Sequence, residues 1–238
     1  MLEIKDFSLI YPNGTVGAKN VNLTIESGDI FAFIGHNGAG KTTTIKSIVG
    51  INNFTSGDIL IDGVSIKKEP QKAKKLIAYV PDNPEVYKSL TGLQFINFIG
   101  EIYEVKKQDL IDRTTEYATK LGLIDNLNDP ISTYSHGMCQ KLVIISALIH
   151  SPKLLVLDEP FVGLDPLATY TLKTIMQEFV KNGGAIFFST HVLEVAEKLC
   201  NKVAIIKNGQ VIKNGTMAEI KQDKSLENVF LESAKWKN

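Results

Sequence analysis

One short glycine-rich stretch carries the pattern that most directly predicts chemistry. Residues 35–42 read Gly35-His36-Asn37-Gly38-Ala39-Gly40-Lys41-Thr42 and fit the arrangement G-x-x-x-x-G-K-[ST]. Glycines in such a loop let backbone N–H groups turn toward a phosphate, and the start of a following helix adds the positive end of its dipole. The lysine of this arrangement reaches the β- and γ-phosphates, and its hydroxyl residue binds Mg²⁺. The stretch therefore predicts a nucleotide-binding loop with Lys41 on the phosphates and Thr42 at a magnesium ion.

Two adjacent carboxylates form a second candidate group. Asp158 and Glu159 directly follow the apolar run 154–157, which predicts a buried strand. Ligands of open α/β sheets bind at the carboxyl edge of the strands. At that edge Asp158 would hold Mg²⁺ through water, and Glu159 would act as the general base for an attacking water. A solvated pair of acids is the alternative, but the phosphate loop in the same chain favours catalysis.

Three further residues have both a structural and a functional interpretation. His191 follows a predicted strand at 185–189 and is either structural or in contact with a γ-phosphate at the same edge. Tyr11 is either an edge aromatic or a platform on which adenine stacks. Ser135 stands where a helix N-cap belongs, which alone would explain a serine. Residue type leaves all three open.

The surrounding pattern predicts the elements that would hold these residues. The apolar run 30–34 before the loop is typical of a buried parallel strand, and residues 43–49 after it have helical spacing. Alternating apolar and polar residues within 2–26 predict antiparallel strands. The dipeptides Asp62-Gly63 and Asn208-Gly209 predict two further hairpins.

Helical patterns dominate residues 83–150. Thr91 and Gln94 form a capping box, a second helix covers 110–121, and a third follows Ser135. These residues predict a helical insertion between strands of the nucleotide-binding sheet. Residues 226–230 predict a short closing helix, ahead of the single tryptophan, Trp236.

Composition excludes several classes of protein. The chain has 238 residues, 44% of them hydrophobic, which suits one large domain or a core with an inserted subdomain. Lysine plus arginine equals aspartate plus glutamate at 26 each, so the basic excess of a nucleic-acid binder is missing. The two cysteines suit a reducing cytosol. We expect no signal peptide and no membrane span, and expect the chain alone to be soluble.

The order and spacing of the motifs resemble the ATP-binding subunit of an ABC transporter over essentially the whole chain. Residues 35–42, 154–159, 163–165 and His191 match that family's Walker A, Walker B, D-loop and switch-histidine positions. Residues 134–138 occupy the signature position as Tyr-Ser-His-Gly-Met. This sequence is similar to the Tyr-Ser-x-Gly-Met variant of ATPases that serve ABC-2-type exporters, including bacitracin- and lantibiotic-resistance systems. The resemblance also favours adenine stacking for Tyr11.

The resemblance implies a fold and a set of site residues. The expected fold class is α/β, with a RecA-like P-loop NTPase core, an N-terminal antiparallel β subdomain and an inserted α-helical subdomain. The core and the antiparallel strands together span 1–82 and 151–238, and the helical subdomain spans 83–150. The implied activity is Mg²⁺-dependent ATP hydrolysis, with Glu159, His191 and Lys41 as catalytic residues. The implied ATP-binding residues are Tyr11, Gly35, His36, Asn37, Gly38, Ala39, Gly40, Lys41, Thr42, Thr43, Ser135 and Gly137. The implied metal ligands are Thr42, Asp158 and Asp82.

Asp82 marks a departure from the family pattern. The loop after the predicted strand 77–80 normally presents a glutamine that touches both Mg²⁺ and the membrane partner. A carboxylate is a harder ligand for Mg²⁺ than an amide, but the aspartate side chain is one carbon shorter. We therefore expect altered coupling between ATP and the partner at this loop.

The resemblance also implies partners. Two such subunits dimerise head to tail around two ATP molecules, and Ser135 of one faces the γ-phosphate held by Lys41 of the other. A separate multi-spanning permease would select the substrate, so the subunit would be cytoplasmic and peripheral on the inner face of the membrane, with no nucleic-acid partner. Two alternatives stay open: a soluble assembly or repair ATPase, and a nucleotide-binding regulator that has lost catalysis.

Overall fold

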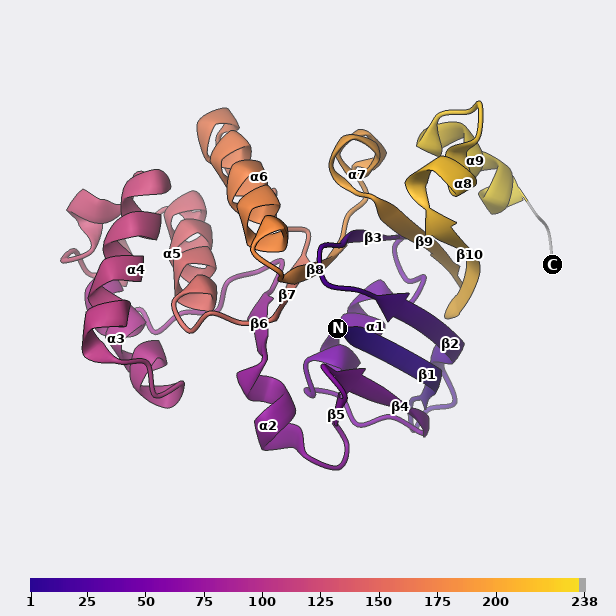
Figure 1. The fold of residues 1–238 in the computed structure, drawn as a ribbon, viewed down its shortest axis with the longest axis horizontal. Coiled ribbons are helices and arrows are strands. Elements are labelled where there is room, and N and C mark those ends of the chain that lie inside the picture. The colour runs from indigo at the N-terminus through magenta and orange to yellow at the C-terminus, as the bar shows by residue number, and fades with distance from the viewer. Residues whose placement is uncertain (236–238) are drawn as a thin grey trace.

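Two β-sheets and their flanking helices make up the structure, a computed structural model that describes residues 1–235 (Figure 1). The smaller sheet is antiparallel, with the strand order β2-β1-β4-β5. Its strands are β1 (Leu2–Ile10), β2 (Val16–Ile25), β4 (Ser56–Ile61) and β5 (Val64–Ser65). The predicted strand pair within 2–26 and the hairpin at Asp62-Gly63 are confirmed.

The larger sheet holds the candidate chemistry. Its order is β10-β9-β3-β8-β7-β6, and all neighbours are parallel except the hairpin of β9 with β10. Its strands are β3 (Ile30–Ile34), β6 (Ile77–Val80), β7 (Leu154–Asp158), β8 (Ala185–Ser189), β9 (Lys202–Lys207) and β10 (Gln210–Thr216). Because β3, β8 and β7 are neighbours, the residues that follow each of them meet at one edge.

The helices fall into two groups. Three lie in the segment between β6 and β7, at one end of the molecule in Figure 1: α3 (Gly92–Ile102), α4 (Lys107–Lys120) and α5 (His136–Leu148). Two short 3₁₀ helices, Ile124–Asn126 and Ile131–Thr133, join α4 to α5. The other helices are α1 (Lys41–Ile48), α2 (Pro70–Lys75), α6 (Pro166–Lys181), α7 (Leu193–Leu199), α8 (Met217–Lys221) and α9 (Leu226–Lys235).

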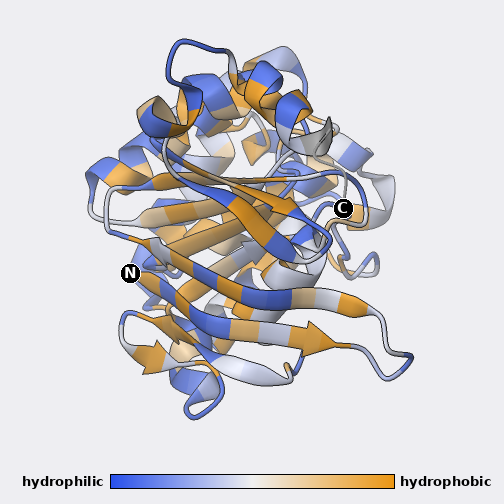
Figure 2. Ribbon diagram, turned by 90° about the vertical axis from the view of Figure 1, so that its right-hand side faces the viewer, coloured by the Kyte–Doolittle hydropathy of each residue, from blue (hydrophilic) through white to orange (hydrophobic). Residues whose placement is uncertain are grey.

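The core has two parts, one on each face of the larger sheet. Successive side chains of a strand point to opposite faces, so Ala32 and Ile34 join one cluster while Phe31 and Phe33 join the other. Phe187 of β8 packs against both phenylalanines, with ring centroids 5.8 Å from Phe31 and 5.2 Å from Phe33. Figure 2 shows hydrophobic residues concentrated in the central strands. This rigid sheet fixes the edge where the candidate residues lie.

The fold class expected from the sequence is confirmed, while some elements were not predicted. The capping box at Thr91 and Gln94 is formed, and α9 lies where a closing helix is expected. Trp236 lies outside the described residues. The helices α2, α7 and α8 had no clear signal because each is short, and a helix of five to seven residues leaves little periodicity to detect.

Candidate active site

The phosphate loop lies between β3 and α1. Gly40 has φ 107°, and a Cβ there would lie 2.4 Å from the carbonyl oxygen of Gly17, so this position requires glycine. Helix α1 begins at the next residue, Lys41, so its unpaired N–H groups are at the loop. The Lys41 ammonium group donates to the carbonyl oxygens of Gly35 at 2.7 Å and His36 at 3.3 Å. The loop thus has the form of an anion cradle with its lysine held across it.

Asp158 ends β7 beside this loop. Its Oδ2 accepts a hydrogen bond from the Thr42 hydroxyl at 3.3 Å, and its Oδ1 accepts one from the Ser189 hydroxyl of β8. The side chain is almost completely buried. The arrangement of α1, β7 and β8 therefore brings Thr42 and Asp158 together, as the sequence predicts for two oxygens around one cation.

Glu159 and His191 form a pair at the same edge. Glu159 Oε1 lies 2.9 Å from His191 Nδ1, and the backbone N–H of His191 donates to Glu159 Oε2 at 3.4 Å. Glu159 adopts a left-handed backbone conformation, with φ 48°. The exposed fraction of the side chain is 17% for Glu159 and 63% for His191. The acid is therefore mostly buried, whereas the histidine beside it is exposed.

Burial, charge and hydrogen bonds act together on the pKa values of Asp158 and Lys41 in this cluster. Burial raises the pKa of Asp158, the nearby charges of Asp82 and Glu159 raise it further, and hydrogen bonds from Ser189 and Thr42 lower it. Burial lowers the pKa of Lys41, against the attraction of Glu159 and Asp158. A cation beside Asp158 and phosphates beside Lys41 would favour the charged form of each.

The residues present fit Mg²⁺. Oxygens of Thr42 and Asp158 are 3.3 Å apart, close to the roughly 3 Å between neighbouring ligands of an octahedral Mg²⁺ ion. Asp82 is near enough for its charge to act on Asp158, although its Oδ1 accepts a hydrogen bond from the Asn83 N–H at 2.8 Å. Within residues 1–235 no group of three or more His, Cys, Asp or Glu side chains forms a metal cage. Mg²⁺ is commonly held by one or two carboxylates together with phosphates and water.

Tyr11 follows β1 in the chain and lies beside the first turn of α1 in space. Its hydroxyl oxygen is 3.0 Å from Oγ1 of Thr43, and a Cβ on Gly17 would lie 2.8 Å from the Tyr11 ring. The tyrosine is thus held beside the phosphate loop and remains partly exposed. Adenine stacking on this ring stays a prediction.

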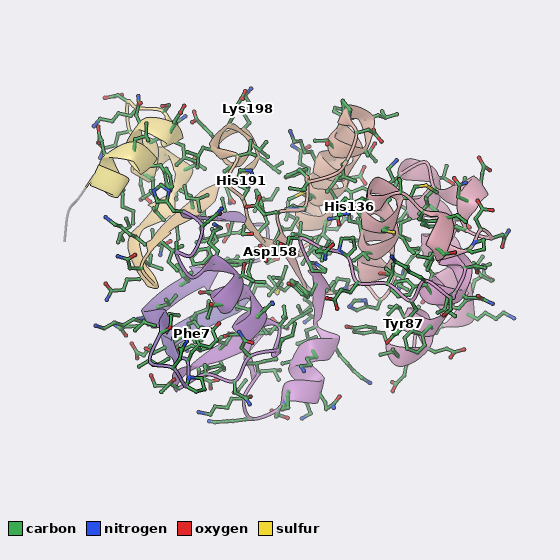
Figure 3. The ribbon with its side chains drawn as sticks, turned by 180° about the vertical axis from the view of Figure 1, so that it is seen from behind. Phe7, Tyr87, His136, Asp158, His191 and Lys198 are labelled. Carbon is green, nitrogen blue, oxygen red and sulfur yellow. The ribbon has the colours of Figure 1, made fainter. Side chains whose placement is uncertain are left out.

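The predicted signature residues Ser135 and Gly137 lie at the N-terminus of α5. Ser135 caps this helix by accepting a hydrogen bond from the Met138 N–H at 3.2 Å. Next to it, Gly137 and His136 pack on Gly163: a Cβ on Gly137 would lie 2.7 Å from the Gly163 carbonyl oxygen. Figure 3 shows His136 on the side of the helical segment, with Asp158 and His191 nearer the centre. Ser135 and Gly137 are not among the residues that line the hollow beside the phosphate loop.

A hollow of about 690 Å³ lies over the cluster. Phosphate-loop and catalytic candidates line it together with residues that the sequence analysis missed. The full lining is Gly35, His36, Asn37, Glu159, Thr190, His191, Leu193 and Phe230. Thr190 and Leu193 could have been found from their proximity to His191 in sequence. Phe230 could not, because only the fold brings α9 to this place.

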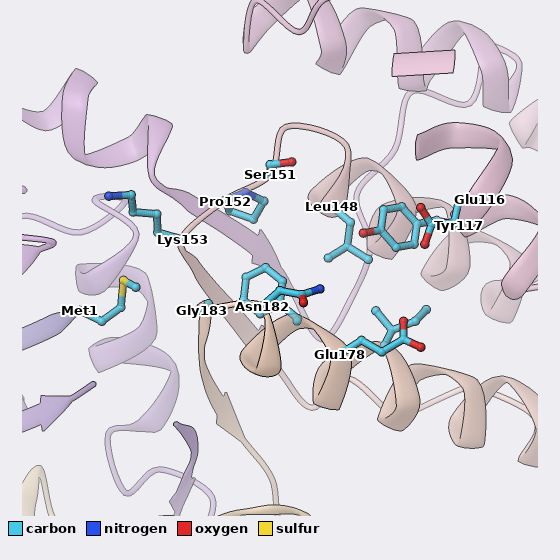
Figure 4. Close-up of a pocket in the computed structure, with 13 residues that line it drawn as sticks. Met1, Glu116, Tyr117, Leu148, Ser151, Pro152, Lys153, Glu178, Asn182 and Gly183 are labelled. Atoms are coloured by element: carbon cyan, nitrogen blue, oxygen red, sulfur yellow. The ribbon is translucent and has the colours of Figure 1, made fainter. Parts of the chain in front are cut away.

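Two of the other hollows are relevant here, and both lie away from the phosphate loop. One, of about 500 Å³, is shown in Figure 4 and is lined partly by Ser151, Lys153 and Gly183, which precede β7 and β8. It is therefore at the opposite edge of the sheet from the catalytic candidates. The other is a groove of about 960 Å³ on the helical segment, which we call the aromatic groove. It is lined by Asn83, Pro84, Glu85, Val86, Tyr87, Lys88, Phe95, Phe98, Ile99, Ile102, Ile131, Ser132, Tyr134, His136 and Cys139.

Comparison with known proteins decides the family. The sequence profile described as ABC transporter matches residues 18–162. The chain belongs to the ABC transporter ATP-binding family. It is 33% identical to the ABC-type transporter ATP-binding protein EcsA of Bacillus subtilis (strain 168), over 99% of this chain and 97% of that protein. It is also 33% identical to the linearmycin resistance ATP-binding protein LnrL of the same organism, over 92% of this chain and 70% of that one.

A solved ABC structure has the same fold. The structure titled as an ATP binding subunit of an ABC transporter superposes with a TM-score of 0.95 at 33% identity, covering 99% of this chain and 100% of that chain. The roles expected of Lys41, Asp158 and Glu159 in ATP binding and hydrolysis stay predictions. No helix in the described part of the chain has the length and apolarity needed to cross a membrane.

Proposed function

We propose that this chain is the Mg²⁺-dependent ATP-hydrolysing subunit that drives transport, in the export direction, through a separate membrane permease. The observation that carries the proposal is the pairing of Glu159 with His191 beside the phosphate loop. A purely regulatory nucleotide-binding protein would not need this sheltered acid. Lys41, Asp158 and Thr42 stand at the same edge, so binding and hydrolysis residues are all present.

Each residue has a distinct role in hydrolysis. Lys41 and the loop N–H groups hold the β- and γ-phosphates, and Tyr11 stacks on adenine. Thr42, Asp158 and Asp82 hold Mg²⁺, which neutralises charge on the phosphates when bound. Glu159 takes the proton of the attacking water, and His191 fixes the carboxylate and contacts the γ-phosphate.

A second copy, or a close relative, completes the site. Ser135 and Gly137 are at the N-terminus of α5, which favours an anion there, yet they do not line their own chain's phosphate pocket. In a head-to-tail dimer these residues face the γ-phosphate held by the other subunit. Hydrolysis then removes the anion that holds the two subunits together, which links turnover to opening.

The aromatic groove is the proposed docking surface for the permease. The side chains of Tyr87, Phe98 and Ile102 are 59%, 40% and 54% exposed. Neighbouring exposed apolar side chains of this size are typical of an interaction surface. The Tyr87 and Phe98 rings meet edge to face at 5.7 Å, which gives the groove a rigid aromatic wall. The groove begins one residue after Asp82, so a permease segment seated in it would also reach the loop at the metal. A permease bound in this groove would make the chain a peripheral subunit on the cytoplasmic face of the membrane.

The export direction rests on the signature variant and on one relative. The sequence Tyr134-Ser135-His136-Gly137-Met138 resembles the variant of exporter ATPases. The relative LnrL is named a linearmycin resistance protein, and a role in resistance is consistent with outward transport of a toxic compound. The zero net charge gives no support to a nucleic-acid partner.

The test is to purify the tagged chain from detergent-solubilised native membranes and identify what accompanies it. We expect a multi-spanning membrane protein at a fixed ratio, and expect Phe98→Glu to lose it because a charge would be desolvated in the groove. The control is Ile111→Ser, which removes an exposed apolar residue of α4 outside the groove. Retention of soluble proteins alone would instead indicate an assembly ATPase.

A further inference from the structure

The C-terminal helix α9 reaches the nucleotide site, although its sequence gives no sign of this. The Phe230 ring lies against the His36 ring, with centroids 4.7 Å apart and an angle of 46° between their planes. His36 is the second residue of the phosphate loop, and both rings line the hollow over Glu159 and His191. Helix α9 and the phosphate loop, which are far apart in the sequence, therefore meet at this hollow.

The backbone of His36 takes part in the structure of the loop. Its carbonyl oxygen accepts hydrogen bonds from the Ala39 N–H at 3.0 Å and from the Lys41 ammonium group at 3.3 Å. The His36 side chain is exposed apart from its contact with Phe230. Phe230 thus makes a ring contact with His36, whose carbonyl oxygen is one of the two that accept hydrogen bonds from Lys41.

Helix α9 is itself anchored to the element that follows the switch histidine. Glu197 of α7 accepts a hydrogen bond from the Leu226 N–H at 2.8 Å and pairs with Lys221 of α8. Leu226 and Val229 are buried in the core cluster that includes Ala196 of α7. Leu193, the first residue of α7, lines the same hollow as Phe230. Figure 1 shows α8 and α9 together at the yellow end of the chain.

We propose that Phe230 is a positioning residue of the nucleotide site, which holds His36 and the first turn of the phosphate loop in the shape that accepts ATP. Helix α9 thereby ties the loop to α7, the helix that follows His191. The loop is preorganised for the phosphates, so less ordering remains when ATP binds. This inference rests on the proposed function, because it concerns the same ATP site.

The ring, and not only its apolar surface, carries the effect. Phe230→Leu keeps apolar packing on the core but removes the aromatic contact with His36, so we expect MgATP to bind about 3- to 10-fold more weakly. Phe230→Tyr keeps the ring and should bind like the natural chain. The matched control is Leu231→Ala, an exposed residue of the same helix, which should also leave affinity unchanged.

The experiment is isothermal titration of each full-length variant with MgATP, together with steady-state KM and kcat. A double-mutant cycle with His36→Ser isolates the contact, because Phe230→Leu should cause no further loss once the histidine ring is gone. His36 is exposed, so this variant keeps the test valid if Phe230→Leu folds poorly. We expect KM to rise while kcat changes less than twofold.

The outcomes separate this inference from the proposed function. If the natural chain binds and hydrolyses ATP but Phe230→Leu binds it equally well, the positioning role is wrong and the ATPase stands. Equal losses in Phe230→Leu, Phe230→Tyr and Leu231→Ala would indicate a general loss of helix packing and would also overturn the role. Failure of the natural chain to bind MgATP would refute the proposed function itself.

Discussion

At the scale of single residues, the site depends on one strained position. Glu159 is neither glycine nor asparagine, yet its φ is 48°, a conformation that costs on the order of 1 kcal/mol or more. The Glu159 N–H donates a hydrogen bond to the Ser189 carbonyl oxygen of β8 at 3.2 Å, and this bond to the sheet holds the backbone in that conformation. The result is a carboxylate turned onto His191 at 2.9 Å. Backbone strain at this position therefore serves the chemistry proposed for Glu159.

A half-buried histidine far from the phosphate loop makes stability depend on pH. Burial lowers the pKa of His150 to about 4, and its Nε2 lies 3.1 Å from the Ile77 carbonyl oxygen. The ring also stacks on Tyr103, with centroids 3.7 Å apart. The unfolded chain protonates this histidine near pH 6.5, whereas the folded chain does not until about pH 4. The unfolded state therefore binds more protons in this range, and acid favours unfolding.

We predict that the free energy of unfolding falls as the pH is lowered from 7 toward 4. The contribution of His150 is at most about 3 kcal/mol, since each pKa unit corresponds to about 1.4 kcal/mol. Chemical denaturation at several pH values measures it. His150→Gln cannot titrate here, so its stability should fall less steeply over the same range. Equal slopes for the two proteins would show that other groups cause the acid sensitivity.

At the scale of elements, two helix caps allow structural and functional roles to be separated. Thr91 caps α3 and Ser135 caps α5, each by accepting a hydrogen bond at 3.2 Å from the N–H three residues later. Both are on the helical segment. Only Ser135 belongs to the proposed signature that faces ATP in a dimer.

We predict that Thr91→Ala and Ser135→Ala each lower the free energy of unfolding by about 1 kcal/mol. Only Ser135→Ala should also reduce ATP turnover, because it removes a hydroxyl directed at the partner's γ-phosphate. Thermal unfolding and steady-state ATPase assays on both variants measure the two effects. Full activity of Ser135→Ala would leave the serine as a cap alone.

Local signals explain which elements the sequence predicts well. The Asn208-Gly209 turn and the Thr91 capping box depend on neighbouring residues, and the structure contains both. The larger sheet brings four candidate residues together because each lies at or after the end of one of its parallel strands. The sequence also predicts this arrangement for Lys41, Asp158, Glu159 and His191. The contact of Phe230 with His36 has no local signal, since it depends on the packing of α9 against α7. Long-range packing of this kind could not be predicted.

At the scale of the whole molecule, the site is divided between two surfaces of one chain. The phosphate loop with Glu159 lies at the edge of the central sheet, and Ser135 lies at the start of α5. In the proposed head-to-tail dimer, a second subunit would bring the two halves together. The ion pair of Lys141 with Asp165, at 3.2 Å, joins α5 to the start of α6 within each subunit. This ion pair links α5 to the segment that follows β7.

The most direct measurement is the mass of Glu159→Gln in solution with MgATP, by size-exclusion chromatography with light scattering. Glutamine preserves the shape of the side chain but cannot take a proton, so hydrolysis should fall by on the order of 100-fold or more and ATP should hold the dimer closed. Lys41→Ala, which cannot grip the phosphates, should remain monomeric under the same conditions. A stable dimer of Glu159→Gln that requires ATP is the predicted result. A monomer at every ATP concentration would contradict the shared-site mechanism.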